Sequence, residues 1–174
     1  MATYIYIDKY IVGSSGASTV TFGSGGTLTQ AYTDLKLVCS TREDDAYYWQ
    51  NIKITFNGST TGYTNLLLYN QDTTTIGSAT NTPGYIQYMY NTGANATSST
   101  FGNTEIYIPN YTSSNYKSLY SDSVTENNGT QILLGLNHSL WANTAAITSI
   151  TIATATGGNY VQNSSFYLYG ILKA

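Results

Sequence analysis

The sequence predicts an all-β protein: one antiparallel β-sandwich of the jelly-roll type, with about ten strands. Short runs rich in Tyr, Ile, Thr and Val alternate with clusters of Gly, Asn and Ser, which is the pattern of strands joined by turns. Several runs carry apolar residues only at every second position, as half-buried strands do. No run has the spacing of a helix that could connect parallel strands. A closed barrel is the alternative architecture.

The predicted strands follow this alternation along the whole chain. Leu35, Leu37 and Cys39 share one strand face, so Cys39 is predicted to be a buried packing thiol. The same period of two places Ile150 and Ile152 together. Strands are predicted at residues 3–12, 18–22, 34–40, 51–57, 63–69, 85–90, 104–109, 116–125, 130–137, 147–154 and 165–172.

The first predicted strand differs from the others because its start is apolar on both faces. A strand of this kind is covered on both sides, which predicts an interface with another subunit. The predicted interface residues are Tyr4, Ile5, Tyr6 and Ile7. We therefore expect an N-terminal arm at residues 1–16 and a sandwich domain at residues 17–174. The Gly- and Ser-rich stretch 13–30 is either a linker between them or two turns around a short strand.

Three segments beside strands are candidates for surface contacts. The charged run Arg42–Asp45 forms a turn that is either a solvated loop, which we favour, or a calcium site. Tyr47, Tyr48 and Trp49 follow it and form either a patch that contacts a receptor or glycan, or the start of a core strand. The polar stretch 71–83 is expected to be a long exposed loop.

The sequence contains no recognisable catalytic constellation. His138 is the single histidine, and neither Ser139 nor Cys39 has the further partner that a triad needs. A glycosidase needs two facing carboxylates, for which the candidates on or beside predicted strands are Glu105, Asp122 and Glu126. We expect a protein that acts by binding, not an enzyme, and we predict no cofactor and no metal.

Charged residues make up only 9% of the chain, against about a quarter in an ordinary soluble domain. A surface of hydroxyls, amides and phenols suits burial against neighbouring subunits or contact with sugars. The basic residues are six in number and scattered, and the net charge is −3, so a nucleic-acid partner is not expected. No run approaches the roughly 20 apolar residues of a membrane helix, so no membrane span is predicted.

The most distinctive strings in the chain are FGNTEIYIPNY at 101–111, SDSV at 121–124 and LWANTAAITS at 140–149. Together with LYGI at 168–171, they resemble a family of small virion proteins of environmental tailed bacteriophages, from marine and freshwater sources. The likeness extends over most of the chain, from about Tyr10 to Leu172.

The resemblance implies a β-sandwich on the outer surface of the phage particle, in one of two roles. One role is a capsid decoration or cement protein, bound to the major capsid protein as a homotrimer. The other is a tail-fibre or spike module that is attached to tail proteins and binds a host receptor or surface glycan. The length favours decoration, because a fibre also needs an attachment region, a shaft and a tip.

Overall fold

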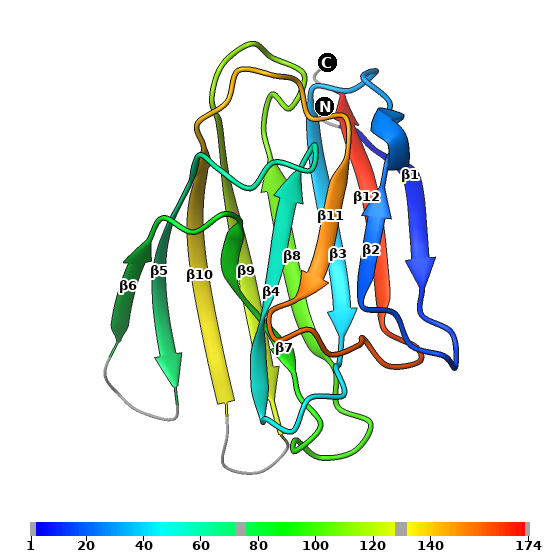
Figure 1. Cartoon of the computed structure of the whole chain (residues 1–174), viewed down its shortest axis with the longest axis vertical. Coiled ribbons are helices and arrows are strands. Elements are labelled where there is room, and N and C mark those ends of the chain that lie inside the picture. The colour runs from blue at the N-terminus through cyan, green and yellow to red at the C-terminus, as the bar shows by residue number, and fades with distance from the viewer. Residues whose placement is uncertain (1–2, 72–75, 128–131, 173–174) are drawn as a thin grey trace.

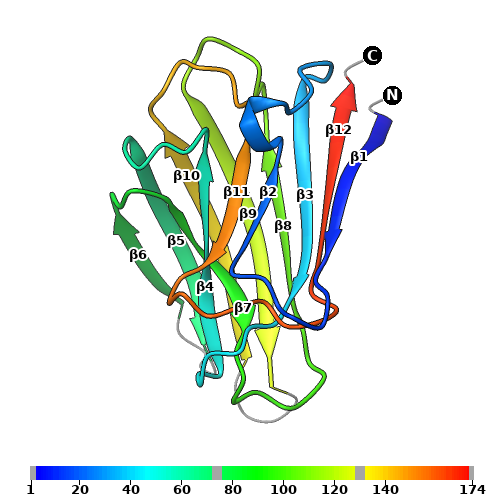
Figure 2. The same cartoon turned by 45° about the vertical axis from the view of Figure 1, so that its right-hand side comes forward.

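The computed structural model describes residues 3–71, 76–127 and 132–172 as two antiparallel sheets packed face to face (Figure 1, Figure 2). This arrangement confirms the predicted all-β sandwich. The larger sheet has the strand order β1-β12-β3-β8-β9-β10-β5-β6, and the smaller sheet has the order β2-β11-β4-β7. The strands are β1 (Thr3–Ile11), β2 (Thr19–Phe22), β3 (Asp34–Thr41), β4 (Trp49–Phe56), β5 (Tyr63–Gln71), β6 (Gly77–Asn81), β7 (Ile86–Thr92), β8 (Gly102–Ile108), β9 (Lys117–Glu126), β10 (Ile132–Trp141), β11 (Ile150–Thr154) and β12 (Ser165–Leu172).

The chain crosses between the sheets at most of its connections, which is the jelly-roll pattern. β2, β11, β4 and β7 form one layer, which faces the viewer in Figure 1. In the other layer, β1, β12, β3 and β8 complete an eight-stranded jelly roll with these four strands. β9, β10, β5 and β6 extend this larger sheet beyond β8, and β1 begins at the same end of the sandwich at which β12 finishes (Figure 2).

Each predicted strand is present, with its ends shifted by a few residues. The prediction of a loop at 71–83 is wrong, because Gln71 ends β5 and Gly77–Asn81 forms β6, an edge strand paired with β5. β6 has the sequence Gly-Ser-Ala-Thr-Asn, which contains no large apolar side chain, so its alternation gives almost no signal. Residues 72–75 of the expected loop lie outside the described residues.

β1 lies at the edge of the larger sheet and pairs with β12, with a register shift after Tyr6 that marks a β-bulge. Ile7 packs against the main core and Ile5 is half-buried, whereas Tyr4 and Tyr6 are exposed. The stretch 13–30 forms turns around β2, which pairs with β11. Of the two interpretations of this stretch, the turns are therefore correct.

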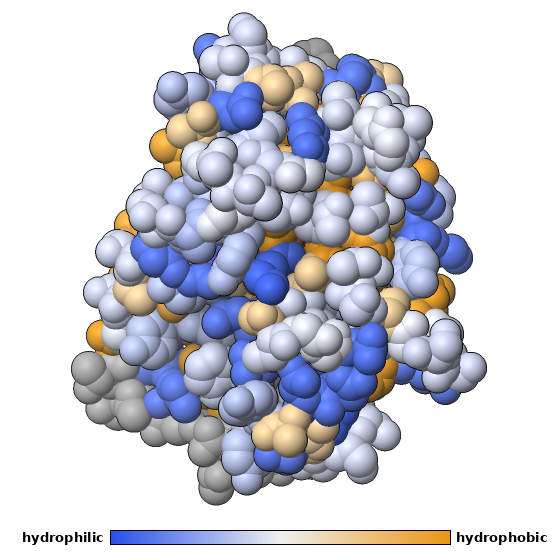
Figure 3. Space-filling view, viewed as in Figure 1, coloured by the Kyte–Doolittle hydropathy of each residue, from blue (hydrophilic) through white to orange (hydrophobic). Residues whose placement is uncertain are grey.

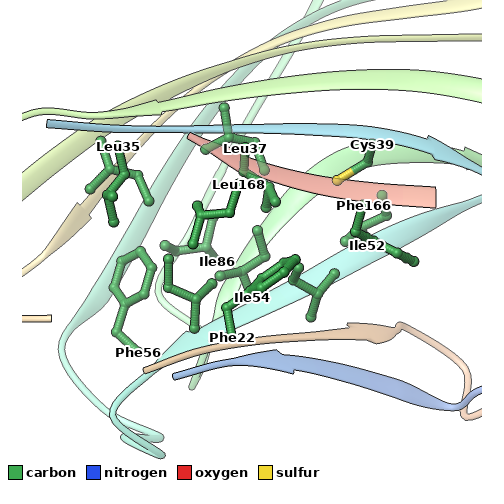
Figure 4. Close-up of a cluster of buried hydrophobic side chains, with 14 of the residues drawn as sticks. Phe22, Leu35, Leu37, Cys39, Ile52, Ile54, Phe56, Ile86, Phe166 and Leu168 are labelled. Atoms are coloured by element: carbon green, nitrogen blue, oxygen red, sulfur yellow. The ribbon is translucent and has the colours of Figure 1, made fainter. Parts of the chain in front are cut away.

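The main core lies between the sheets, where apolar side chains of both layers interdigitate (Figure 4). Leu35, Leu37 and Cys39 of β3 are at most 1% exposed, which confirms the predicted strand face. Burial raises the pKa of the Cys39 thiol, so this cysteine is the inert packing residue that the sequence predicts. At one end of the core the ring of Trp141 stacks on Tyr63 at 6.1 Å.

A second, smaller apolar cluster lies towards β5 and β6 and is built around Leu67, Tyr90 and Leu133. A buried polar network separates it from the main core. Ser139 Oγ donates a hydrogen bond to Asn65 Oδ1 at 2.6 Å, and Asn137 Nδ2 donates one to Ser139 Oγ at 3.0 Å. Because the smaller sheet ends at β7, it does not cover the whole inner face of the larger sheet (Figure 1).

Candidate functional site: the outer face of the larger sheet

The outer face of β10 is apolar, although it faces away from the sandwich. β10 alternates strictly between exposed and buried residues. The buried series includes Leu133, Ser139 and Trp141, which contribute to the interior. The exposed series is Ile132, Leu134, Leu136, His138 and Leu140. A strand with apolar residues on both faces is typical of sheets that are covered on both sides.

The neighbouring strands extend this apolar surface. Leu136 lies opposite Leu68 of β5, and Leu134 lies opposite Val124 of β9. We call the resulting patch the leucine face; its members, each 36–50% exposed, are Leu66, Leu68, Val124, Ile132, Leu134, Leu136 and Leu140. It presents on the order of 600 Å² of apolar surface, as large as the largest patch of a typical monomer, and such patches are often functional.

A groove of about 330 Å³ lies at one end of the leucine face, beside Leu66 and His138. The rings of Tyr107 and Tyr120 form part of its wall, with centroids 5.4 Å apart. Tyr107 donates a hydrogen bond to Asp34 at 2.6 Å, which raises the pKa of this phenol to about 12. The groove wall is therefore aromatic, and the hydrogen bond to Asp34 holds the Tyr107 ring in place.

The outer face of the smaller sheet gives a contrast. Its surface is mainly hydrophilic (Figure 3), and the hydroxyls of Thr21 and Thr151 are hydrogen-bonded to each other at 3.0 Å. An apolar patch on one outer face and a polar surface on the other make the two sides of the sandwich chemically different. The leucine face is the side that is suited to burial against another protein.

The predicted interface residues divide between the two sides of β1. Tyr4 and Tyr6 lie on the same outer face as the leucine face, at the other edge of the sheet. The ammonium group of Lys36 lies 5.6 Å from the Tyr4 ring, and Tyr6 contacts Tyr169 edge to face at 6.3 Å. Ile5 and Ile7 face inward and are half-buried.

The carboxylates that we considered for hydrolysis also lie on β8 and β9. Glu105 and Asp122 are directly opposite each other, and Glu105 forms an ion pair with Lys36 at 2.7 Å. Glu126 ends β9, opposite Ile132. Both side chains of the ion pair are partly exposed, so it contributes at most about 1 kcal/mol.

His138 does not meet either of the nucleophiles considered for it. Ser139 points to the opposite side of β10 and bonds Asn65, and Cys39 is in the core. In the part of the chain that the structure describes, no three His, Cys, Asp or Glu side chains come close enough together to hold a metal ion. What this face offers chemically is apolar contact area.

The turn Arg42–Asp45 is not the solvated loop that we favoured. The Arg42 guanidinium donates hydrogen bonds at 2.8–3.1 Å to four backbone carbonyls, those of Ala94, Ala96, Thr97 and Thr100. Glu43 is fully buried, and burial, together with the charge of Asp45, raises the pKa of its carboxyl to about 8. The Asp44 carboxylate instead accepts hydrogen bonds from Asn159, which lower its pKa.

Part of the aromatic triplet beside this turn is exposed, and part of it is packed against other side chains. Tyr47 and Tyr48 are about half exposed, as a contact patch requires. Trp49 begins β4 and packs edge to face on Tyr90 at 5.3 Å. Trp49 therefore begins a strand, as one interpretation holds, whereas contact of Tyr47 and Tyr48 with a receptor or glycan stays a prediction.

The leucine face is the feature that sequence reasoning missed. Its signal is present in the apolar runs at 66–68 and 132–134, which break the alternation. Comparison with protein-family models and with curated proteins finds no match for this chain. Within the described ranges, no helix is long and apolar enough to cross a membrane.

Proposed function

We propose that this chain is a structural subunit of a bacteriophage virion, a decoration or cement protein on the outer surface of the capsid that acts by binding. The sequence resemblance motivates this proposal, and the leucine face is the observation that carries it. An apolar surface of this size is costly to leave in water. It becomes favourable when other subunits of the particle cover it.

We propose that sister copies of this chain cover the leucine face, in a homotrimer. A standard protein interface buries about 800 Å² on each partner, and the leucine face supplies much of that area. The low charge of the chain favours such contact, because few ions need to be desolvated. The exposed edge of β1, with Tyr4 and Tyr6, remains available to contact the major capsid protein.

Cementing follows from mass action in this proposal. A subunit that binds the assembled shell, and not its separated parts, shifts the equilibrium towards the shell. Many copies of a modest interface add up to a large effect, because each copy also raises the local concentration of its neighbours.

A second function, a tail-fibre or spike module that binds a host receptor or surface glycan, is favoured by Tyr47 and Tyr48. Two adjacent half-exposed tyrosines in one turn form a rigid aromatic contact surface. The copy number per particle distinguishes the two roles. Quantitative mass spectrometry and imaging of purified particles should find hundreds of copies over the shell, and a few copies at the tail would favour the spike module instead.

A further inference from the structure

A separate hollow lies on the inner side of the larger sheet, next to β7, where the smaller sheet ends. It has a volume of about 210 Å³ and is lined by β4, β5, β6, β7 and β10. We call it the aromatic cleft, after the side chains Trp49, Tyr69, Tyr88 and Tyr90 that line it. Tyr90 is buried and the other three are half-buried, so the cleft is open to solvent.

The rings of the cleft are held by the sheet below them. A Cβ on Gly77 would lie 2.5 Å from Tyr69 Cζ, so this glycine lets the ring lie on β6. Gly135 of β10 has the same relation to Tyr90, which in turn contacts Trp49 edge to face at 5.3 Å. Rings that are fixed in this way lose little conformational entropy when a ligand binds.

Tyr88 is held in a backbone conformation that tyrosine rarely adopts. Its φ is +70°, in the left-handed region, at the register shift between β4 and β7. A bulge of this kind ordinarily carries glycine, which has no steric penalty there. Strained residues persist where the surrounding structure holds them, and they cluster at binding sites. Tyr88 places an aromatic ring in the cleft at the expense of this strain.

The cleft also contains an unsatisfied polar atom. Asn51 lines it, and the Oδ1 atom of this side chain is buried and has no hydrogen-bond partner among the described residues. A buried amide oxygen without a partner is unfavourable, and a turn of the Asn51 side chain towards the cleft would let a ligand hydroxyl donate to it. Tyr69, Tyr88 and Tyr90 all line the cleft, and burial, together with the nearby phenols of Tyr69 and Tyr88, raises the pKa of Tyr90.

We propose that the aromatic cleft binds one neutral sugar ring of a saccharide, with its C–H face on the aromatic side chains and a hydroxyl donating to Asn51 Oδ1. Sugar C–H groups carry partial positive charge and are attracted to the negative face of an aromatic ring. None of the described residues that line the cleft is charged, so they offer nothing to a phosphate or carboxylate. Drug-sized ligands occupy pockets of about 300–1,000 Å³, and the smaller cleft suits a single ring.

This site does not depend on the role proposed above, because it is on the other side of the larger sheet from the leucine face. Tryptophan fluorescence reports directly on this site, because Trp49 lines the cleft. The other tryptophan of the chain, Trp141, is buried in the core. The purified chain is titrated with the methyl glycosides of glucose, galactose, mannose and N-acetylglucosamine. Tryptophan fluorescence and saturation-transfer NMR are recorded, and at least one glycoside should give a saturable response in both.

Two variants test the assignment. Tyr88→Gly suits the positive φ, so it should keep or raise the unfolding temperature while it weakens binding at least tenfold. Tyr116→Ala, a control at an exposed tyrosine outside the cleft, should bind as the wild type does. The proposal is overturned if no glycoside gives a saturable response, or if Tyr88→Gly binds with unchanged affinity. Saturation by N-acetylphenylalaninamide in place of the glycosides would also overturn it, in favour of a partner protein's apolar side chain.

Discussion

The ring of Tyr90 lies directly against Gly135, where a Cβ would come within 2.5 Å of Tyr90 Cε2. Because Tyr90 is buried, it cannot swing away. We expect Gly135→Ala to lower the free energy of unfolding by about 1–3 kcal/mol, as overpacking does. Gly13→Ala is the matched control, because a Cβ at Gly13 meets nothing within 4 Å. Equal denaturation midpoints for the two variants would show that this close contact is unimportant.

Arg42 holds the segment 94–100 through four carbonyl groups, and lysine cannot reproduce that pattern with one ammonium. We expect Arg42→Lys to lower the free energy of unfolding by about 2 kcal/mol, within the range for hydrogen bonds to charged groups. Amide hydrogen exchange should become faster in residues 94–100 and not in the core strands. Lys9→Gln, which removes an exposed cation, should leave the exchange unchanged. Unaltered exchange in Arg42→Lys would contradict the role assigned to this side chain.

Glu43 should make the protein less stable as the pH rises. Its pKa is about 8 in the folded chain and 4.5 when unperturbed, so between these values the folded state holds a proton that the unfolded state has lost. The contribution of this proton to the free energy of unfolding is complete below pH 4.5 and is lost by about pH 8. Between these values the free energy of unfolding falls by up to about 1.4 kcal/mol per pH unit.

Glu43→Gln keeps the shape of the side chain and cannot ionise. Urea denaturation of the wild type at pH 5 and pH 8 should show the loss of stability, and the variant should lose less. Parallel pH profiles for the two proteins would mean that the Glu43 carboxyl is ionised in the folded state.

The sequence predicts the strands and the main core because both depend on local alternation. The period of two places Leu35, Leu37 and Cys39 on one strand face, and the structure buries them together on that face. β6 escapes prediction because an edge strand of small polar residues has no apolar face to detect. Its existence depends on pairing with β5.

The candidate sites are harder to predict, because they depend on which strands become neighbours. Leu68 and Leu136 are far apart in the sequence and meet only through the pairing of β5 with β10. Alternation also cannot reveal that the smaller sheet ends at β7, which leaves Trp49 and Tyr88 at the edge of an open cleft. Single residues such as Trp49 were recognisable, but their shared surface was not.

The most direct test of assembly through the leucine face is the solution mass of the purified chain and of Leu136→Asp, by sedimentation equilibrium. Leu136 is near the centre of the patch, and a carboxylate there should prevent its burial against a sister copy. Thr19→Asp, on the exposed side of the smaller sheet, is the control. We expect the wild type and the control to have three times the 18.9 kDa mass of one chain, and Leu136→Asp to be a folded monomer. A wild type that stays monomeric at high concentration, or a trimer that survives Leu136→Asp, would contradict this assembly.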